Sequence, residues 1–562
     1  MLNTNYLAFS NDALHSIPWL SLLIFLPLIG ALLTALWPER GDARTNKWGA
    51  FALSLAPLGI AILLATQFQG TRVDNGLQQV YEFPERLNWV SVLGVQYFLG
   101  LDGISLPLVL LCTIMTPVCI LASFNLQFRP RYFLALLLLM ETAMLGVFLS
   151  LNFFLFFIFW EVSLIPGYYL ISVWGRENRR YASFKFFVYT MAGSVGMLLG
   201  FEFLYLATSQ AGRGTFDIVE LTRLAQGLPV QINATAGNFR GDLQTIVYTY
   251  FSSLRFTELL GGASAFGMMS GIFWAVFVAL AVKLAVWPFH TWLPDAYSEA
   301  PTAGSMLISS VLTKMGAYAM LRLMLPLFPA QMQRYASILG FLAFASIIIG
   351  AWVAYNQRDA DVKRLISYLS INHMGYVMLA IAAAGAAGLA NVDSRATAIN
   401  GAVMQMVAHG LSTGALFFLA GILAERTGSY RLPDFGGLRT LIPVFAGAMG
   451  VAMFANLGLP GMAGFVGEFF IFRGTWTTLP LLTIFAMLGL VISALALLLM
   501  YQRIFSGPVN ERWRGIPDLT LREWGVVLPL LALLIVWGIY PLPLMRIANS
   551  TAIALVQFFS HT

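Results

Sequence analysis

The chain has 562 residues, of which 59% are apolar and only 10% are charged, and its formal net charge is +6 at pH 7. Soluble proteins carry about a quarter charged residues, so this composition excludes a soluble enzyme, a disordered protein and a disulfide scaffold. Two cysteines cannot supply the roughly four ligands of an iron–sulfur cluster. The small positive charge does not require nucleic acid, because the asymmetry of basic residues across a membrane produces it.

Apolar runs of about 20 residues, the length that crosses a bilayer, occur fourteen times along the chain. None alternates apolar and polar residues as a membrane barrel does, and backbone groups in lipid must bond within their own segment. We therefore expect an all-α, polytopic membrane protein with about fourteen transmembrane helices. In chain order, these spans are 17–37, 48–66, 104–124, 132–151, 153–173, 185–207, 269–288, 303–325, 335–355, 365–385, 396–424, 440–472, 481–502 and 524–545.

The basic residues between these spans favour one orientation. Alternate short connections hold nineteen Lys and Arg residues, Lys363 among them, and the other short connections hold five, including Arg322. Basic residues collect on the inner side of a membrane, so the N-terminus is expected outside. With an even number of spans, the C-terminus is expected outside as well.

Seven ionisable side chains lie well inside the expected spans, away from their ends. A charge at the bilayer centre costs about 2.5–3.5 kcal/mol on insertion scales, so such residues usually mark ion or proton pathways. Helix-to-helix ion pairing is the plainer explanation for the charged groups, and each histidine could be a satisfied core residue. A proton path is the more specific interpretation, because it assigns one function to the whole set. The set comprises Glu141, Glu161, Lys283, Lys314, His373, His409 and Glu468.

Two spans carry helix breakers beside an ionisable residue. Pro288 follows Lys283 in one, and the segment NLGLPGMAG at 456–464 precedes Glu468 in the other. Broken helices at corresponding places in two halves indicate inverted repeats with sites near the midplane. We expect N-terminal helices over 1–131, a five-helix repeat over 132–325 with a long outer loop at about 208–268, a second repeat over 326–505, and a C-terminal helix within 506–562.

Six long motifs resemble the antiporter-like membrane subunits of respiratory complex I, the NADH:quinone oxidoreductase, and in particular the chain M (NuoM, NdhD) type. The likeness covers nearly the whole chain. A glutamate in the second broken helix, where other members carry lysine, favours the chain M type. The motifs are FFIFWEVSLIPGYYLISVWG (156–175), AVKLAVWPFHTWLPDAYSEAPTAGS (281–305), VLTKMGAYAMLR (311–322), DVKRLISYLSINHMGYV (361–377), MQMVAHGLSTGALFFLAG (404–421) and LPGMAGFVGEFFIF (459–472).

The resemblance implies a proton relay. Glu161 of the FWE motif would pair with Lys283 of AVK, and Lys314 of LTK would be the central relay group. His409 of MVAHG would continue the path, and Glu468 would be its far end. The supporting residues would be His373 and Glu141.

The resemblance also implies a setting for the chain. It would be the proton-translocating membrane-arm subunit of an NADH:quinone oxidoreductase, in a bacterial inner membrane or, in a photosynthetic host, a thylakoid membrane. FMN, iron–sulfur clusters and quinone would lie on partner subunits, with no cofactor or metal on this chain. Its partners would be the other membrane-arm subunits, including two antiporter-like paralogues. The open alternatives are a ferredoxin-linked photosynthetic complex, a membrane hydrogenase, a multi-subunit sodium/proton antiporter and a passive scaffold.

Overall fold

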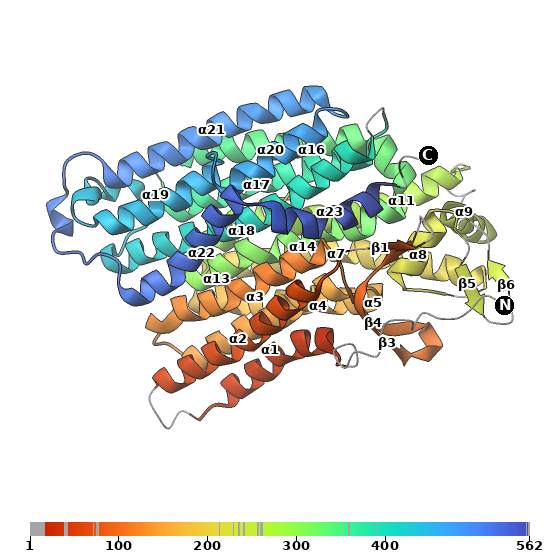
Figure 1. The fold of residues 1–562 in the computed structure, drawn as a ribbon, viewed down its shortest axis with the longest axis horizontal. Coiled ribbons are helices and arrows are strands. Elements are labelled where there is room, and N and C mark those ends of the chain that lie inside the picture. The colour runs from red at the N-terminus through yellow and green to blue at the C-terminus, as the bar shows by residue number, and fades with distance from the viewer. Residues whose placement is uncertain are drawn as a thin grey trace.

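The protein is a bundle of long helices that run side by side, as the computed structural model in Figure 1 shows. Within the described residues, twelve helical segments are long and apolar enough to cross a membrane. The other two expected spans, 303–325 and 440–472, are present as shorter pieces. The all-α membrane fold is therefore confirmed. The structure describes residues 17–38, 43–70, 72–74, 78–212, 214–228, 230–233, 237–239, 242–255, 258, 262–357, 360–388, 391–557 and 559.

The long helices follow the expected order along the chain. They are α1 (Trp19–Leu36), α2 (Ala43–Gln67), α3 (Ser105–Ala122), α4 (Pro130–Leu149), α5 (Phe153–Val162), α6 (Leu164–Trp174), α7 (Arg179–Gln210), α11 (Ala265–Leu284), α16 (Pro329–Asn356), α17 (Val362–Gly385), α18 (Val392–Thr427), α19 (Pro443–Leu457), α20 (Ala463–Thr475), α21 (Pro480–Phe505), α22 (Leu521–Ile539) and α23 (Leu542–Gln557).

Both expected breaks are present. Helix α11 ends at Leu284, Ala285 adopts the left-handed conformation (φ 60°), and the chain resumes as α12 (Trp292–Glu299) after Pro288. Helix α19 ends at Leu457 and is capped by Gly458. Gly458 has a φ of 80°, which glycine adopts without the steric cost that a Cβ imposes on other residues. These interruptions free backbone groups in the middle of the bundle, next to Lys283 and Glu468.

Two further interruptions were not expected. The 302–327 segment is divided into α13 (Thr302–Leu307), α14 (Lys314–Ala319) and α15 (Leu325–Leu327) by π-turns at Ile308–Leu312 and Met320–Met324. Between α5 and α6 a helical hydrogen bond is missing next to Ser163, because Pro166 cannot donate to the carbonyl of Val162, although Ser163 itself keeps helical dihedral angles (φ −62°, ψ −23°). Isolated π-turns occur frequently at functional sites, and these two flank the helical turn that carries Lys314.

One end of the bundle carries three antiparallel hairpins and two short helices, a group that the sequence analysis did not anticipate (Figure 1). We call this the hairpin end. In the described part of the expected outer loop at about 208–268 lie two helices and one of the hairpins. The elements are β1 (Arg72–Asp74), β2 (Gln78–Val80), β3 (Glu82–Val90), β4 (Val95–Leu101), β5 (Val230–Asn233), β6 (Gly237–Phe239), α8 (Ile218–Ala225) and α9 (Leu243–Ser253).

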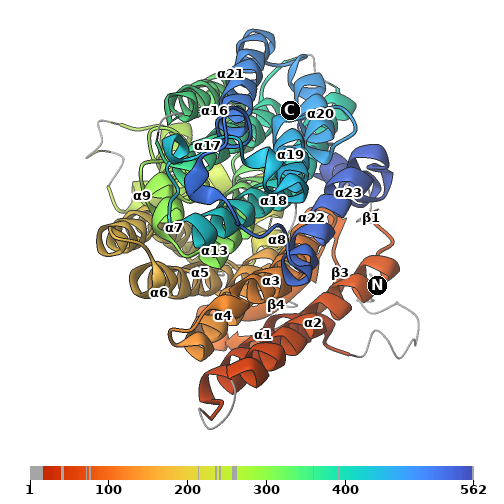
Figure 2. The ribbon, with the colours of Figure 1, turned by 90° about the vertical axis from the view of Figure 1, so that its left-hand side faces the viewer.

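Helices α17 and α18 form the centre of the bundle. The apolar stretch of α18 is 100% buried and that of α17 is 94% buried, whereas only 28% of α2 and 33% of α21 are buried. Figure 2 shows α1 and α2 at one edge and α21 at the opposite edge. The repeat boundaries stay a prediction. Arg40 and Arg358, two of the basic residues used to orient the chain, lie outside the described residues, as do both chain ends.

Candidate functional site

Lys283, in the last turn of α11, is 1% exposed and points toward the break between α5 and α6. Its Nζ lies 3.0 Å from Ser163 Oγ, to which it donates, and 4.9 Å from the centre of the Trp160 ring. Glu161 lies two residues before Ser163, but its carboxylate and the Lys283 ammonium, both described, are not within the 4.0 Å of an ion pair. The Ser163 hydroxyl is therefore the nearest polar partner of Lys283.

Lys314 begins α14 and is completely buried. Its Nζ lies 2.7 Å from His409 Nδ1 on α18 and donates to the carbonyl of Ser309, at 2.5 Å. That carbonyl lies in the π-turn before α14, where the regular helical bonding is interrupted. A lysine on α14 and a histidine on α18 thus share one hydrogen bond.

His373 lies between His409 and Glu468. The two imidazole ring centres are 5.3 Å apart, and His373 Nδ1 is 3.3 Å from Glu468 Oε1. The side-chain amide of Gln405 contacts both partners, at 3.2 Å from His373 Nδ1 and 3.3 Å from Glu468 Oε1. Four expected residues, Lys314, His409, His373 and Glu468, therefore lie in one buried row. The two imidazoles are neighbours in it without a hydrogen bond, and His409 Nε2 has no hydrogen-bond partner among the described residues.

Asn456, near the end of α19, holds the opposite side of the His373 ring. Its Oδ1 is 3.1 Å from His373 Nε2, and its Nδ2 donates to the hydroxyls of Ser412, at 3.0 Å, and Thr413, at 3.3 Å. Both ring nitrogens of His373 thus have a polar neighbour. The protein fixes the orientation of this imidazole between α18 and the broken helix.

Glu141, on α4, is completely buried and lies apart from this row. Its electrostatic neighbours include the thiols of Cys112 and Cys119 on α3. Both carboxylate oxygens lack a hydrogen-bond partner by geometric criteria. Its supporting role stays a prediction.

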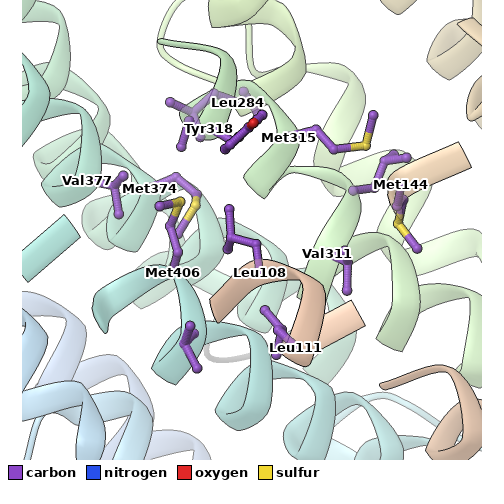
Figure 3. Packing of buried hydrophobic residues seen from close by; sticks show 14 of the residues in the cluster. Leu108, Leu111, Met144, Leu284, Val311, Met315, Tyr318, Met374, Val377 and Met406 are labelled. Atoms are coloured by element: carbon purple, nitrogen blue, oxygen red, sulfur yellow. The ribbon is translucent and has the colours of Figure 1, made fainter. Parts of the chain in front are cut away.

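The space between Lys283 and Lys314 is tightly packed. A Cβ on Gly316 would lie 2.7 Å from the backbone nitrogen of Leu284, so only glycine allows α14 to approach the end of α11 this closely. Figure 3 shows Leu284, Met315 and Tyr318 packed in this region, beside Met374 and Met406. The lysines are therefore separated by an apolar contact, and the structure records no hydrogen bond between the two side chains.

The sequence analysis missed three polar residues of this region. Gln405 and Asn456 are uncharged, so a search for ionisable groups passed over them, although Gln405 lies one helical turn before His409 in the MQMVAHG motif. Lys363 was counted as a loop residue, but it is fully buried and donates to the Ala300 carbonyl and to Ser305 Oγ. The amides complete the row between the histidines and Glu468, whereas Lys363 joins α17 to the α12–α13 junction.

Comparisons with known proteins identify the family of the chain. The family model described as "NADH:quinone oxidoreductase/Mrp antiporter, TM" matches residues 150–239 and 244–494. The chain is 36% identical to the F(420)H(2) dehydrogenase subunit M of Methanosarcina mazei, over 96% of this chain and 98% of that relative. It is 35% identical to the NADH-quinone oxidoreductase subunit M of Rhodobacter capsulatus, over 96% of each chain.

The fold is also similar to a solved structure. A chain of respiratory complex I from Thermus thermophilus with bound NADH aligns over 96% of this chain and 99% of that one, with a TM-score of 0.79 and 26% identity. The similarity extends beyond the helices matched by the family model and covers the hairpin end and the C-terminal helices.

Proposed function

Because the chain belongs to the antiporter-like membrane subunits of the NADH:quinone oxidoreductase and Mrp antiporter family, we propose that it translocates protons within an oxidoreductase complex of the complex I type. Redox chemistry in partner subunits drives the transfer. The relay consists of Glu161, Lys283, Lys314, His409 and Glu468, with His373 as a full member rather than a supporting one. Glu141 keeps a supporting role.

One observation carries this proposal, the buried row of titratable side chains from Lys314 to Glu468. Lys314 contacts His409 at 2.7 Å, and His373 contacts Glu468 at 3.3 Å. Lysine, histidine and carboxylate side chains can each take up and release a proton, and the two histidine rings lie 5.3 Å apart. A row held for packing alone would not need three kinds of titratable group in contact through the most enclosed helices.

Proton uptake and release are controlled at the Lys283 end of the relay. A carboxylate that approaches a buried ammonium favours its protonated form, and withdrawal of the carboxylate favours proton release. In this structure Ser163 occupies the position next to Lys283, and Glu161 lies outside ion-pair distance. A shift of α5 at the Ser163 break would alter that distance. Partner subunits could drive the shift without any redox group on this chain.

The setting follows from the same proposal. FMN, iron–sulfur clusters and quinone lie on partner subunits, and the electron donor is determined there. The partners are other membrane-arm subunits, including two antiporter-like paralogues. The chain lies in a bacterial inner membrane with both termini outside, so the hairpin end faces outward.

Replacement of Lys283 by alanine tests the proposal. We expect Lys283→Ala to leave the complex assembled, because the nearest partner left behind is a neutral hydroxyl, and to lower proton translocation per electron severely. Lys283→Arg should rescue poorly, because a guanidinium does not release its proton near neutral pH. Proton uptake and quinone reduction are measured in membrane vesicles, with assembly checked on a native gel.

Lys47→Ala is the matched control. Lys47 is also buried, but it donates to the carbonyls of Phe124, at 2.8 Å, and Leu126, at 2.7 Å, away from the row. Its loss should leave proton translocation per electron unchanged. Parental pumping in an assembled Lys283→Ala complex would refute the relay, and equal losses in both variants would show that removal of any buried lysine disturbs the bundle.

A further inference from the structure

Arg322 is the only other basic residue on the segment that carries Lys314, and the relay does not use it. It lies eight residues after Lys314, in the second π-turn, and its side chain is only 4% exposed. Tyr318 lies between the two, four residues from each, and Lys314 and Tyr318 share one face of α14 because residues four apart are neighbours on a helix. Tyr318 and Arg322 thus place polar groups on the side of Lys314 that faces the hairpin end.

The guanidinium of Arg322 is enclosed by three partners. Its Nε donates to the Tyr318 hydroxyl at 3.1 Å, its Nη1 donates to the Tyr81 hydroxyl at 2.9 Å, and its Nη2 pairs with the carboxylate of Asp102. Asp102 is 0% exposed. We call Tyr81, Asp102, Tyr318 and Arg322 the Arg322 cluster.

The cluster closes the bundle where the hairpins begin. Tyr81 directly precedes β3, and Asp102 directly follows β4, so both ends of this hairpin meet the guanidinium. Farther out, Arg86 on β3 is 46% exposed and pairs at 2.8 Å with Asp217, the N-cap of α8. Arg322 therefore connects Tyr318, inside the bundle, to the base of the β3–β4 hairpin, and the Arg86–Asp217 pair lies farther toward the surface.

Arginine cannot pass a proton along such a chain of hydroxyl groups. It has five N–H donors and no acceptor, and it does not deprotonate in proteins. The Tyr318 hydroxyl is held in place as well, because it donates to the Phe148 carbonyl at 2.8 Å while accepting from Arg322. Proton hopping between the hydroxyls of Tyr318 and Tyr81 is interrupted at the guanidinium.

We propose that the Arg322 cluster is a proton-tight seal, which closes the Lys314 site toward the hairpin end so that protons leave through Glu468. This inference rests on the proposed relay and adds a direction to it. A relay without such a seal would let protons return from the outer side to Lys314 and dissipate the gradient. A donor-only cation paired with a carboxylate blocks this return and leaves no uncompensated charge in the bundle.

Two double variants test the seal. Asp102→Asn/Arg322→Gln removes both charges but keeps side chains that donate and accept hydrogen bonds. Asp102→Leu/Arg322→Met removes both charges and fills the site with apolar groups of similar size, a kind of replacement that buried ion pairs often tolerate. Passive proton conductance is measured in liposomes that hold the purified complex and a trapped pH-sensitive dye, without electron donor and under a potassium diffusion potential.

We expect the Asn/Gln variant to conduct protons about tenfold faster than the parent, the effect of a barrier lowered by one or two hydrogen bonds. The Leu/Met variant should stay as tight as the parent. A purely structural role predicts that both variants behave alike. Equal conductance in the two, or failure of both to assemble, would overturn the proposal.

Lys314→Ala in the Asn/Gln background separates the seal from the relay. If the leak passes through the relay, this third substitution should abolish it. The leak is measured without turnover, so it does not depend on the outcome for Lys283→Ala. Loss of pumping in Lys283→Ala without a leak in the Asn/Gln variant would refute only the seal, whereas parental pumping in Lys283→Ala would refute the relay itself.

Discussion

Gly458 offers a test of the Glu468 position that removes no titratable group. It ends α19 with φ 80°, and a Cβ built on it would lie 2.3 Å from Glu468 Oε2. Gly458→Ala therefore pushes the carboxylate by at least 0.7 Å, the difference between this distance and the 3.0 Å that real Cβ contacts respect. The push acts on a carboxylate that already lies 3.3 Å from both His373 Nδ1 and Gln405 Nε2.

Two costs follow from this substitution. The left-handed conformation costs a non-glycine residue about 1–2 kcal/mol, which lowers stability without unfolding a bundle of this size. At 3.3 Å the two contacts of Glu468 are near the limit of a hydrogen bond, so a displacement of 0.7 Å away from either partner breaks it. Misplacement of a reacting group by about 1 Å can slow a reaction by two orders of magnitude. We expect the larger effect on proton translocation.

Gly447→Ala is the control for this experiment. Gly447 lies in the same helix, and a Cβ there meets nothing within 4 Å, so alanine should be neutral or stabilise α19 by up to about 1 kcal/mol. Protons translocated per electron are measured in vesicles, and thermal stability is measured on the purified complex. Parental stoichiometry in an assembled Gly458→Ala complex would refute the argument that Glu468 must hold its place beside His373.

Two further predictions concern the ends of the bundle. Burial and the nearby Glu220 carboxylate raise the pKa of Asp217 to about 7, against the opposing effect of Arg86. Because this carboxyl stays protonated in the folded protein up to a higher pH than in an unfolded segment, docking of α8 should weaken as pH rises from about 4 to about 7. Hydrogen exchange of 215–225 should show this trend, and Asp217→Asn should remove it; an unchanged trend in Asp217→Asn would assign it to another group. A cysteine label at Arg512, an exposed residue between α21 and α22, should react from the cytoplasmic side, and reaction only from the opposite side would reverse the proposed orientation.

Hydropathy and helix breakers determined the fold because a bilayer leaves the backbone few choices. An apolar run such as α18 must be helical in lipid, and Pro288 and Gly458 interrupt the two helices in which they were expected to do so. The ionisable residues were equally visible, since a charge within such a run is costly and therefore conspicuous. The hairpins escaped notice because they lie between the apolar runs, outside the segments that hydropathy can describe.

Which side chains meet was decided by the packing of helices far apart in the sequence. The resemblance implied a Glu161–Lys283 pair, and only the structure shows that the Ser163 hydroxyl lies 3.0 Å from the Lys283 ammonium. Gln405 carries no charge, and its amide joins His373 to Glu468 only because α18 packs against the broken helix.

The surroundings of basic residues near the ends of helices also could not be predicted from the sequence. Lys363 and Arg322 look like loop residues by position, yet both are buried because the fold brings polar partners to them. Lys363 donates a hydrogen bond to the carbonyl of Ala300, sixty-three residues away, and Arg322 donates to the carboxylate of Asp102. Local sequence specifies which residues can form helices and carry charge, whereas long-range packing determines whether a given charge meets lipid, water or a partner.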